Sequence, residues 1–168
     1  MKLYILRHAI AEDRDENLYP DDSLRHLTEK GEKKMVKIAE HLKNMDIQLD
    51  VILTSPYVRA FETAKIVAKT FGIKKNQLVL SDHLIPSGFA KDLIAEINEN
   101  FQVENLMLVG HEPYLSDLVA MLMAGDPSIS ITMKKGGLCC LSIDNLGYDK
   151  CATLEWLMTP AQLIKMGK

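Results

Sequence analysis

Short apolar runs alternate with amphipathic segments along most of the chain. Four of the runs have the length and apolar character of buried strands, at residues 3–6, 50–54, 78–80 and 106–109. After each comes a segment in which apolar side chains recur at helical spacing, at residues 28–45, 55–71, 87–101 and 112–125. Strands that alternate with helices favour a mainly parallel sheet with helices on both faces. We therefore expect an α/β fold, a three-layer αβα sandwich.

The end of the chain changes this pattern. Residues 137–143 and 151–156 have strand-like composition, and the turn-forming residues 144–147 between them predict a hairpin. Such a hairpin adds at least one antiparallel strand and makes the sheet mixed. Apolar positions within residues 158–166 could cover the sheet or mediate a dimer. With 168 residues and no repeat or linker, the chain is expected to form a single domain over residues 1–168.

Composition argues against several classes of function. The net charge of -3 provides no positive field for nucleic acid or an anionic membrane. No segment approaches the roughly 20 apolar residues of a membrane span, and Arg7 and His8 interrupt the first apolar run before it could be a signal peptide. Cys139, Cys140 and Cys151 are odd in number and lack CxxC spacing, so we interpret them as reduced core thiols. The expectation is a soluble cytoplasmic domain.

Capping residues predict where the helices begin and end. Thr28 is suited to cap the first helix, Ser55-Pro56 to start the second, and Gly72 to end it. Ser87-Gly88 and Glu112-Pro113 are expected to open the third and fourth helices. These boundaries locate the segments that connect each strand to the next helix, which is where ligand sites of open α/β sheets lie.

Three of these junctions carry cationic or near-cationic side chains. The first strand ends in Arg7 and His8, the second helix has Arg59 on its first turn, and the fourth strand ends just before His111. Because the carboxyl ends of parallel strands lie along one edge of a sheet, these residues are expected to converge. Helix amino termini at this edge would add N–H groups and partial positive charge. The pattern predicts an anion pocket that contains a nucleophilic imidazole.

Three motifs within residues 1–124 resemble the histidine phosphatase superfamily. They are Leu6-Arg7-His8, the sequence SPYVRAFETA of residues 55–64 and the sequence VGHEP of residues 109–113. The sequence LRHLTEKG of residues 24–31 is similar to the SixA-type phosphohistidine phosphatases of that superfamily. Ala9 stands where the superfamily often has glycine, and His26 replaces a frequent proline. The resemblance implies a phosphoglycerate-mutase-like fold and a phosphohistidine intermediate.

The resemblance implies a role for four residues, and general chemistry supports each role. His8 would attack phosphorus through one ring nitrogen while the other donates its proton to a backbone carbonyl. Arg7 and Arg59 would bind the phosphoryl oxygens, and His111 would donate a further hydrogen bond in either protonation state. Water would then release phosphate. No step requires a metal or a cofactor, and the sequence offers no convincing metal-ligand cluster.

Other residues near these motifs admit structural roles. Arg25 either braces the site or pairs with the acidic stretch that precedes it. Glu62 lies about one turn after Arg59 and is expected to be its partner within the helix. His26 and His41 are interpreted as surface residues.

The leaving group distinguishes a phosphatase that acts on phosphate esters from one that acts on phosphohistidine. An alkoxide leaves a phosphate ester with help from a general acid, which contributes about 10² to 10⁴ in rate. Asp82 and His83 are the candidate acids, and Glu12, Asp13 and Glu112 also lie near predicted strand ends. None of them is compelling from sequence. Phosphohistidine needs less acid help, because its P–N bond is labile and imidazole is its leaving group.

Three hypotheses follow in order of preference. The first is a phosphatase that acts on phosphohistidine of a protein such as a phosphotransfer domain, which the absence of a cap insertion would admit. The second is a small-molecule phosphomonoesterase, for example of sugar phosphates. The third is a non-catalytic module that binds phosphorylated partners, although the intact His8 counts against it.

Overall fold

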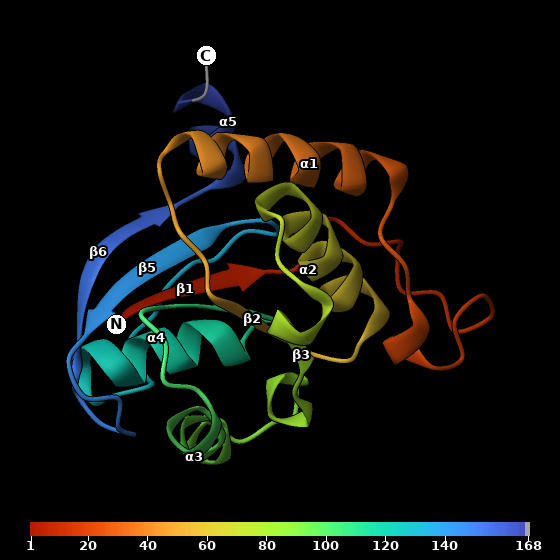
Figure 1. Ribbon diagram of the computed structural model, residues 1–168. Coiled ribbons are helices and arrows are strands. Elements are labelled where there is room, and N and C mark those ends of the chain that lie inside the picture. The colour runs from red at the N-terminus through yellow and green to blue at the C-terminus, as the bar shows by residue number, and fades with distance from the viewer. Residues whose placement is uncertain (167–168) are drawn as a thin grey trace.

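The computed structural model describes residues 1–166, in which one mixed sheet is flanked by helices (Figure 1). The strands lie in the order β3-β2-β4-β1-β5-β6. Their bounds are β1 Lys2–Arg7, β2 Val51–Thr54, β3 Leu78–Leu80, β4 Asn105–Gly110, β5 Leu138–Ile143 and β6 Ala152–Met158. The pairs β2–β3, β2–β4 and β1–β4 are parallel, whereas β1–β5 and β5–β6 are antiparallel. The predicted mainly parallel sheet with a carboxyl-terminal hairpin is confirmed.

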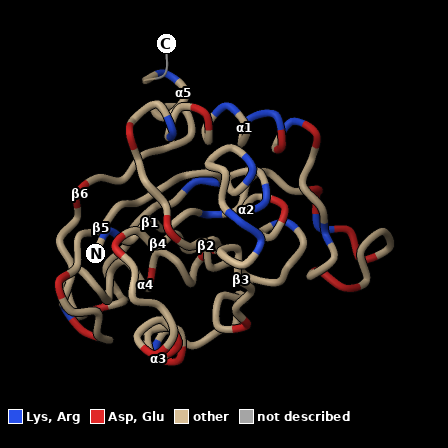
Figure 2. The backbone as a smooth tube through the Cα atoms, viewed as in Figure 1, with Lys and Arg blue, Asp and Glu red and all other residues tan. Residues whose placement is uncertain are grey.

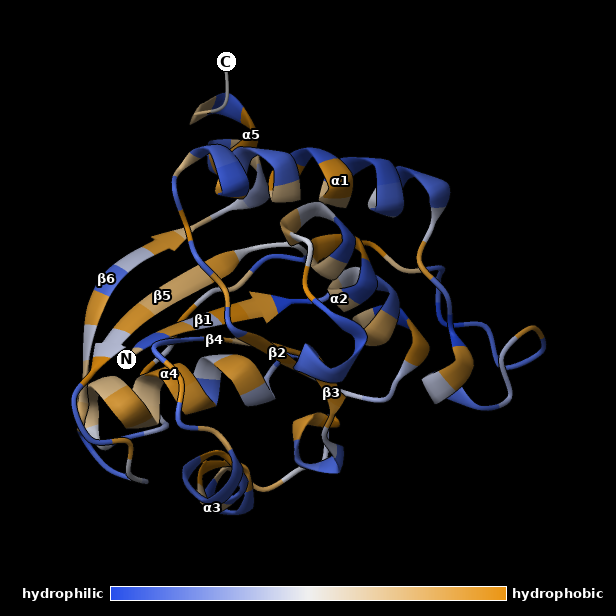
Figure 3. Ribbon diagram, viewed as in Figure 1, coloured by the Kyte–Doolittle hydropathy of each residue, from blue (hydrophilic) through white to orange (hydrophobic). Residues whose placement is uncertain are grey.

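Helices cover both faces of this sheet. One face carries α1 (Glu29–Asn44), α2 (Val58–Phe71) and α5 (Pro160–Met166), and the other carries α3 (Ala90–Asn100) and α4 (Tyr114–Ala124). Successive side chains of a strand point to opposite faces, so Leu6 of β1 packs in the core beneath α1 and α2, while Ile5 packs beside α3 and α4. Figure 3 shows the apolar strands between the helix layers, with α1 largely hydrophilic and α4 largely apolar. The three-layer sandwich is therefore built on two separate cores.

For the first two helices, the start of α1 and the end of α2 are confirmed, whereas the predicted start of α2 is wrong. Thr28 caps α1, since its Oγ1 accepts the backbone N–H of Gly31 at 2.9 Å. Gly72 ends α2 in the left-handed conformation, with φ +73°. However, α2 begins at Val58 and not at Ser55-Pro56. Ser55 forms a turn in which its Oγ accepts the N–H of Tyr57 at 3.3 Å, a bond that competes with a helix cap.

The helices α3 and α4 also begin later than predicted. The first residue of α3 is Ala90, two residues after Ser87-Gly88, and that of α4 is Tyr114. Gly88 lies in a close turn, where a Cβ atom would stand 2.2 Å from the carbonyl oxygen of His83. The glycine therefore permits a close backbone approach and does not start a helix.

The carboxyl-terminal helix packs against α1. Leu163 of α5 is fully buried, and its carbonyl oxygen accepts a hydrogen bond from Nδ1 of His41 at 3.1 Å. His41 is consequently half-buried, and its interpretation as a surface residue was wrong. Of the two alternatives for residues 158–166, the structure supports packing of this segment onto the body of the protein.

Within residues 1–166, no helix is long and apolar enough to cross a membrane. The same part of the chain holds no group of three or more His, Cys, Asp or Glu side chains placed to bind a metal ion. Cys139 and Cys140 are buried, Cys151 is half-buried, and all three are unpaired.

Candidate active site

The site forms where β1 and β4 end side by side. Arg7, the last residue of β1, lies in register with Gly110 of β4, and the N–H of His8 donates to the Gly110 carbonyl at 3.0 Å. This pairing brings His8 and His111 together, with ring centroids 5.2 Å apart. Both rings are almost fully buried, with exposed fractions of 5% and 2%. The parallel pairing of β1 with β4 thus brings together two histidines that are 103 residues apart in the sequence.

The tautomer of His8 is set by its neighbour in the chain. Its Nδ1 lies 2.7 Å from the Ala9 carbonyl oxygen, which can only accept, so Nδ1 carries the proton. Burial lowers the pKa of His8 to about 3, helped by the charges of Arg59 and Arg7 and opposed by the bond to Ala9. The ring is therefore neutral near pH 7, and Nε2 keeps its lone pair. These are the properties of a nitrogen nucleophile.

Arg7 is fixed by the loop that precedes β5. Its Nη1 donates to the Met133 carbonyl at 2.7 Å, and its Nε has no hydrogen-bond partner among the described residues. The N–H of Gly136 lies 3.1 Å from the carbonyl oxygens of both Arg7 and His8. Gly136 adopts φ +78°, a conformation that favours glycine. The loop thereby holds the backbone of the Arg7-His8 pair from the side opposite β4.

Arg59 reaches the site from the first turn of α2. Its side chain is only 3% exposed. Nη1 donates to the backbone carbonyl of Asp22 at 2.8 Å, and Nη2 donates to its carboxylate at 2.9 Å. The guanidinium also lies 5.1 Å from the ring centroid of Tyr57, at cation–π distance. Its Nε, like that of Arg7, has no partner among residues 1–166.

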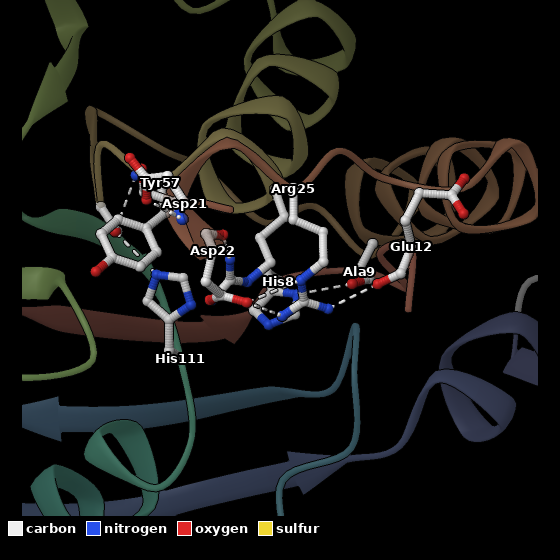
Figure 4. A network of polar contacts seen from close by, with 11 residues as sticks. His8, Ala9, Glu12, Asp21, Asp22, Arg25, Tyr57 and His111 are labelled. Atoms are coloured by element: carbon white, nitrogen blue, oxygen red, sulfur yellow. Dashed lines mark hydrogen bonds and ion pairs between the residues drawn. The ribbon is translucent and has the colours of Figure 1, made fainter. Parts of the chain in front are cut away.

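Arg25 completes this polar network (Figure 4). Its Nε and Nη2 both lie 3.0 Å from Oδ1 of Asp22, and its Nη1 donates to the Glu12 carbonyl at 2.7 Å. Both interpretations of Arg25 therefore apply, since it pairs with the acidic loop and that loop in turn holds Arg59.

Glu62 has a different partner from the one predicted. Its carboxylate accepts a hydrogen bond from Nδ1 of His26 at 2.7 Å and from the N–H of Leu27 at 2.9 Å. The prediction of an intrahelical pair with Arg59 was wrong, because Arg59 turns toward Asp22. His26 is exposed, as expected, and its hydrogen bond with Glu62 joins the segment before α1 to α2.

His111 contacts Ser55 and Tyr57, which lie between β2 and α2. Its Nε2 lies 2.9 Å from Oγ of Ser55, and the Tyr57 ring meets it edge-on at 5.1 Å. Burial, together with the proximity of His8 and the charge of Arg59, lowers the pKa of His111 to about 2. The ring is therefore neutral before any anion binds.

Unpartnered polar atoms collect at this site. Among the described residues, the buried side-chain nitrogen and oxygen atoms without a hydrogen-bond partner are Arg7 Nε, Arg59 Nε, His111 Nδ1 and Tyr114 Oη. Three of these four belong to residues that the sequence singled out. Buried donors without partners are costly in folded proteins and point to a ligand that satisfies them. An anion with several oxygens, such as a phosphoryl group, fits this donor set.

Comparison with known proteins gives the family. The model of the histidine phosphatase superfamily (branch 1) matches residues 3–84. The phosphohistidine phosphatase SixA homolog of Haemophilus influenzae is 33% identical over 130 residues, which cover 73% of this chain and 77% of that protein. The chain belongs to the histidine phosphatase superfamily. Phosphohistidine phosphatase SixA of Escherichia coli is 28% identical to this member over 170 residues, 100% of this chain and 99% of its own length.

Solved structures share the fold of this histidine phosphatase superfamily member. The protein histidine phosphatase SixA, solved with tungstate, matches with a TM-score of 0.80 at 24% identity, covering 97% of this chain and 99% of that one. The α-ribazole phosphatase of Shigella flexneri matches with a TM-score of 0.70 at 18% identity, covering 95% and 97%. Proteins named for different substrates thus share this architecture, so the substrate has to be argued from the site.

The candidate acids differ in their surroundings. Asp82 is exposed and His83 half-buried in a short 3₁₀ turn after β3, and no hydrogen bond or ion pair within residues 1–166 joins either to the four site residues. Glu112 follows His111 directly and is half-buried. Burial raises the pKa of Glu112, although its bond from the Ser116 N–H and the charge of Arg7 act in the opposite direction. Within this histidine phosphatase, Glu112 is therefore the carboxyl group best placed to hold a proton.

Sequence reasoning missed three residues of the site. Asp22 was one of several acidic residues in a polar loop, and nothing in its spacing distinguished it. Ser55 was interpreted only as a helix cap, yet it contacts His111. Thr63 lies one turn after Arg59, and its Oγ1 accepts the N–H of Ala9 at 3.0 Å. A polar residue on the buried face of α2 was the signal that could have revealed Thr63.

Proposed function

We propose that the chain is a phosphohistidine phosphatase that removes the phosphoryl group from phosphohistidine on a protein, through a covalent intermediate on His8. The observation that carries this proposal is the hydrogen bond between His8 Nδ1 and the Ala9 carbonyl at 2.7 Å. It leaves Nε2 unprotonated in a buried, neutral ring beside three unpartnered donors. A group meant only to bind phosphate would need no such lone pair.

In the first step, the Nε2 lone pair of His8 forms a bond to phosphorus while the P–N bond of the substrate breaks. The electron pair of that bond leaves with the substrate imidazole, which departs neutral when its other ring nitrogen carries a proton. Arg7, Arg59 and His111 donate to the phosphoryl oxygens, whose charge persists through a loose transition state. The negative charge of the group is matched by two guanidinium ions that already lie in the pocket.

In the second step, water attacks phosphorus and the bond to Nε2 breaks. Nδ1 of His8 keeps its proton, which it donates to the Ala9 carbonyl, so the phosphorylated ring is cationic. When the bond from Nε2 to phosphorus breaks, the ring is released as neutral imidazole. Inorganic phosphate leaves with the oxygen of the water, whose proton passes to the phosphate or to solvent. His8 returns to its starting tautomer, so the Ala9 carbonyl serves both steps.

Two considerations support a phosphohistidine substrate. The imidazole leaving group makes a strong general acid unnecessary, and within the described part of the chain neither Asp82 nor His83 is hydrogen-bonded to the four site residues. The relatives from Haemophilus influenzae and Escherichia coli carry the name phosphohistidine phosphatase and match most of the chain. We also propose that residues 1–168 act as one domain in the cytoplasm, where unpaired cysteines such as Cys151 are stable.

One observation favours a second candidate, a phosphomonoesterase. Glu112 is half-buried next to His111, and burial raises its pKa. A carboxyl group that retains its proton could protonate the oxygen of an ester leaving group. The two candidates share the His8 chemistry and differ only in what leaves.

The first experiment compares phosphate release from a phosphohistidine-bearing phosphotransfer protein and from a panel of sugar phosphates. We expect preference for phosphohistidine, and a loss of at least about 10⁴-fold in kcat for His8→Ala, since removing a nucleophile has effects of this order. His41→Gln, a histidine on α1 away from the site, is the control and should retain activity. Preference for a sugar phosphate would support the esterase. Phosphate binding without turnover on any substrate would support a binding module and reject both enzymes.

A further inference from the structure

The guanidinium of Arg59 is held on one side by a single residue, Asp22. Both terminal nitrogens of Arg59 are bonded to it, Nη1 to the backbone carbonyl at 2.8 Å and Nη2 to the carboxylate at 2.9 Å. No other hydrogen bond of the Arg59 guanidinium occurs among the described residues, and its Nε is buried without a partner. The orientation of this guanidinium therefore depends on Asp22.

Asp22 is itself fixed by its surroundings. Arg25 contacts Oδ1 of Asp22 with two nitrogens at 3.0 Å, so the carboxylate bridges two arginines. Arg25 is anchored in turn to the Glu12 carbonyl at 2.7 Å. Figure 2 shows this loop between β1 and α1 as a segment of mixed acidic and basic residues. The loop thus has a rigid point of contact with α2 at Asp22.

The position of Arg59 matters to both histidines. After burial, the charge of Arg59 is among the causes that lower the pKa of His8 and that of His111. The guanidinium lies 5.1 Å from the centroid of the Tyr57 ring, which lies 5.1 Å from the His111 ring, and the His111 ring lies 5.2 Å from that of His8. A phosphoryl group bound to His8 would therefore lie beside this cluster. In Figure 4, Asp22, Arg25, His8 and His111 gather at one place.

We propose that Asp22 is a positioning residue, which fixes the Arg59 guanidinium so that its Nε faces the phosphoryl oxygens. This inference rests on the proposed function for its consequence in turnover. A planar guanidinium binds oxygens well only when its plane is fixed. One Asp22 carboxylate is shared by the guanidinium ions of Arg25 and Arg59, so a net positive charge remains to attract a phosphoryl group.

The alternative is that Asp22 only stabilises the acidic loop. A double-mutant cycle distinguishes the two, with the affinity for inorganic phosphate measured by calorimetry in wild type, Asp22→Ala, Arg59→Ala and the double variant. We expect Asp22→Ala to weaken phosphate binding about tenfold and to lower kcat/KM by up to about 10², the loss that a misplaced group can cause. In the Arg59→Ala background, the same change should have less than about a twofold effect, because no guanidinium remains to be positioned.

Asp21→Ala is the matched control. Asp21 is the adjacent, exposed residue, and among residues 1–166 its carboxylate accepts a backbone hydrogen bond only from the N–H of Ser23, in the same turn. We expect this variant to bind phosphate as the wild type does. If Asp22→Ala does not fold, Asp22→Asn replaces it, since the amide keeps an oxygen and loses the charge, and a weaker loss of phosphate affinity is expected.

Three results would overturn the inference. They are unchanged or tighter phosphate binding in the Asp22 variant, an equal loss in the Arg59→Ala background, and an equal loss for Asp21→Ala. Calorimetry requires no turnover, so the inference and the proposed function can fail separately. Coupling between Asp22 and Arg59 in a protein that releases no phosphate from phosphohistidine would keep the first and reject the second.

Discussion

Thr63 Oγ1 accepts the backbone N–H of Ala9 at 3.0 Å and donates its own proton to the Arg59 carbonyl at 2.7 Å. One fully buried hydroxyl therefore ties α2 to the residue that follows His8. The carbonyl of Ala9 holds His8 Nδ1, so Thr63 helps to fix the residue that sets the tautomer of the nucleophile. Thr63 therefore influences the nucleophile through Ala9, without contacting the phosphoryl group itself.

Replacing Thr63 with valine keeps the shape of the side chain and leaves the buried Ala9 N–H without a partner. We expect the free energy of unfolding to fall by about 1–3 kcal/mol, the cost of an unsatisfied buried group. Turnover of phosphohistidine should fall on the order of tenfold, because the Ala9 peptide loses its anchor. Denaturant unfolding and phosphate release measure the two effects. Thr70→Val is the control, since the Thr70 hydroxyl donates to the Ile66 carbonyl within the same helix.

The pKa values of the two site histidines predict how stability depends on pH. Burial lowers the pKa of His8 to about 3 and that of His111 to about 2, while both are about 6.5 in an unfolded chain. As pH falls below about 6.5, the unfolded state binds protons that the folded state does not. The free energy of unfolding therefore decreases as the pH falls below about 6.5, by at most about 1.4 kcal/mol per pH unit for each ring, and it is unaffected by these rings above that pH.

Urea unfolding at pH 7, 6 and 5 measures this loss. His111→Asn removes one of the two rings, and we expect its stability to fall less steeply with acid than that of the wild type. Equal slopes for the two proteins would contradict the assignment of His111 as a buried neutral ring.

Local periodicity was sufficient to predict most of the fold. Buried strands such as β1 and β4 are short apolar runs, and their alternation with amphipathic helices allows few topologies. Helix starts were harder, because a serine that caps a helix and a serine that forms a turn have the same local sequence. Ser55 was predicted to cap a helix, but it forms a turn. Its contact with His111 joins residues 56 positions apart and could not be read from the local sequence.

The site was predictable where it depends on strand ends and unpredictable where it depends on loops. Arg7, His8 and His111 follow strands that pair in register, so their convergence follows from topology. Glu62 shows the opposite case, since helical spacing suggested Arg59 as its partner. The actual donors are His26 and Leu27, 36 and 35 residues away in the chain. No local pattern reports a contact at that separation.

Replacing Gly31 with alanine is expected to destabilise the protein, although the same replacement usually stabilises a helix. Replacing glycine with alanine inside a helix ordinarily stabilises it by about 1 kcal/mol. Here a Cβ atom on Gly31 would stand 2.1 Å from the carbonyl oxygen of Ile10, a backbone atom that must move to make room. We expect Gly31→Ala to lower the free energy of unfolding by about 1–3 kcal/mol, as overpacking does. Gly147→Ala is the control, because nothing lies within 4 Å of its Cβ; equal stability of the two variants would refute the close approach.

Glu112 provides the test that separates the two leaving groups. If its carboxyl group protonates an ester oxygen, Glu112→Gln should lower kcat/KM for a sugar phosphate by about 10² or more, as removal of a general acid does. The loss for phosphohistidine should be at least tenfold smaller, since an imidazole can depart without that proton. Glu112 also caps the first turn of α4 through the Ser116 N–H at 3.1 Å, and the glutamine oxygen can accept the same bond. Equal losses on both substrates would show that Glu112 orients Arg7 or α4 and donates no proton to the leaving group.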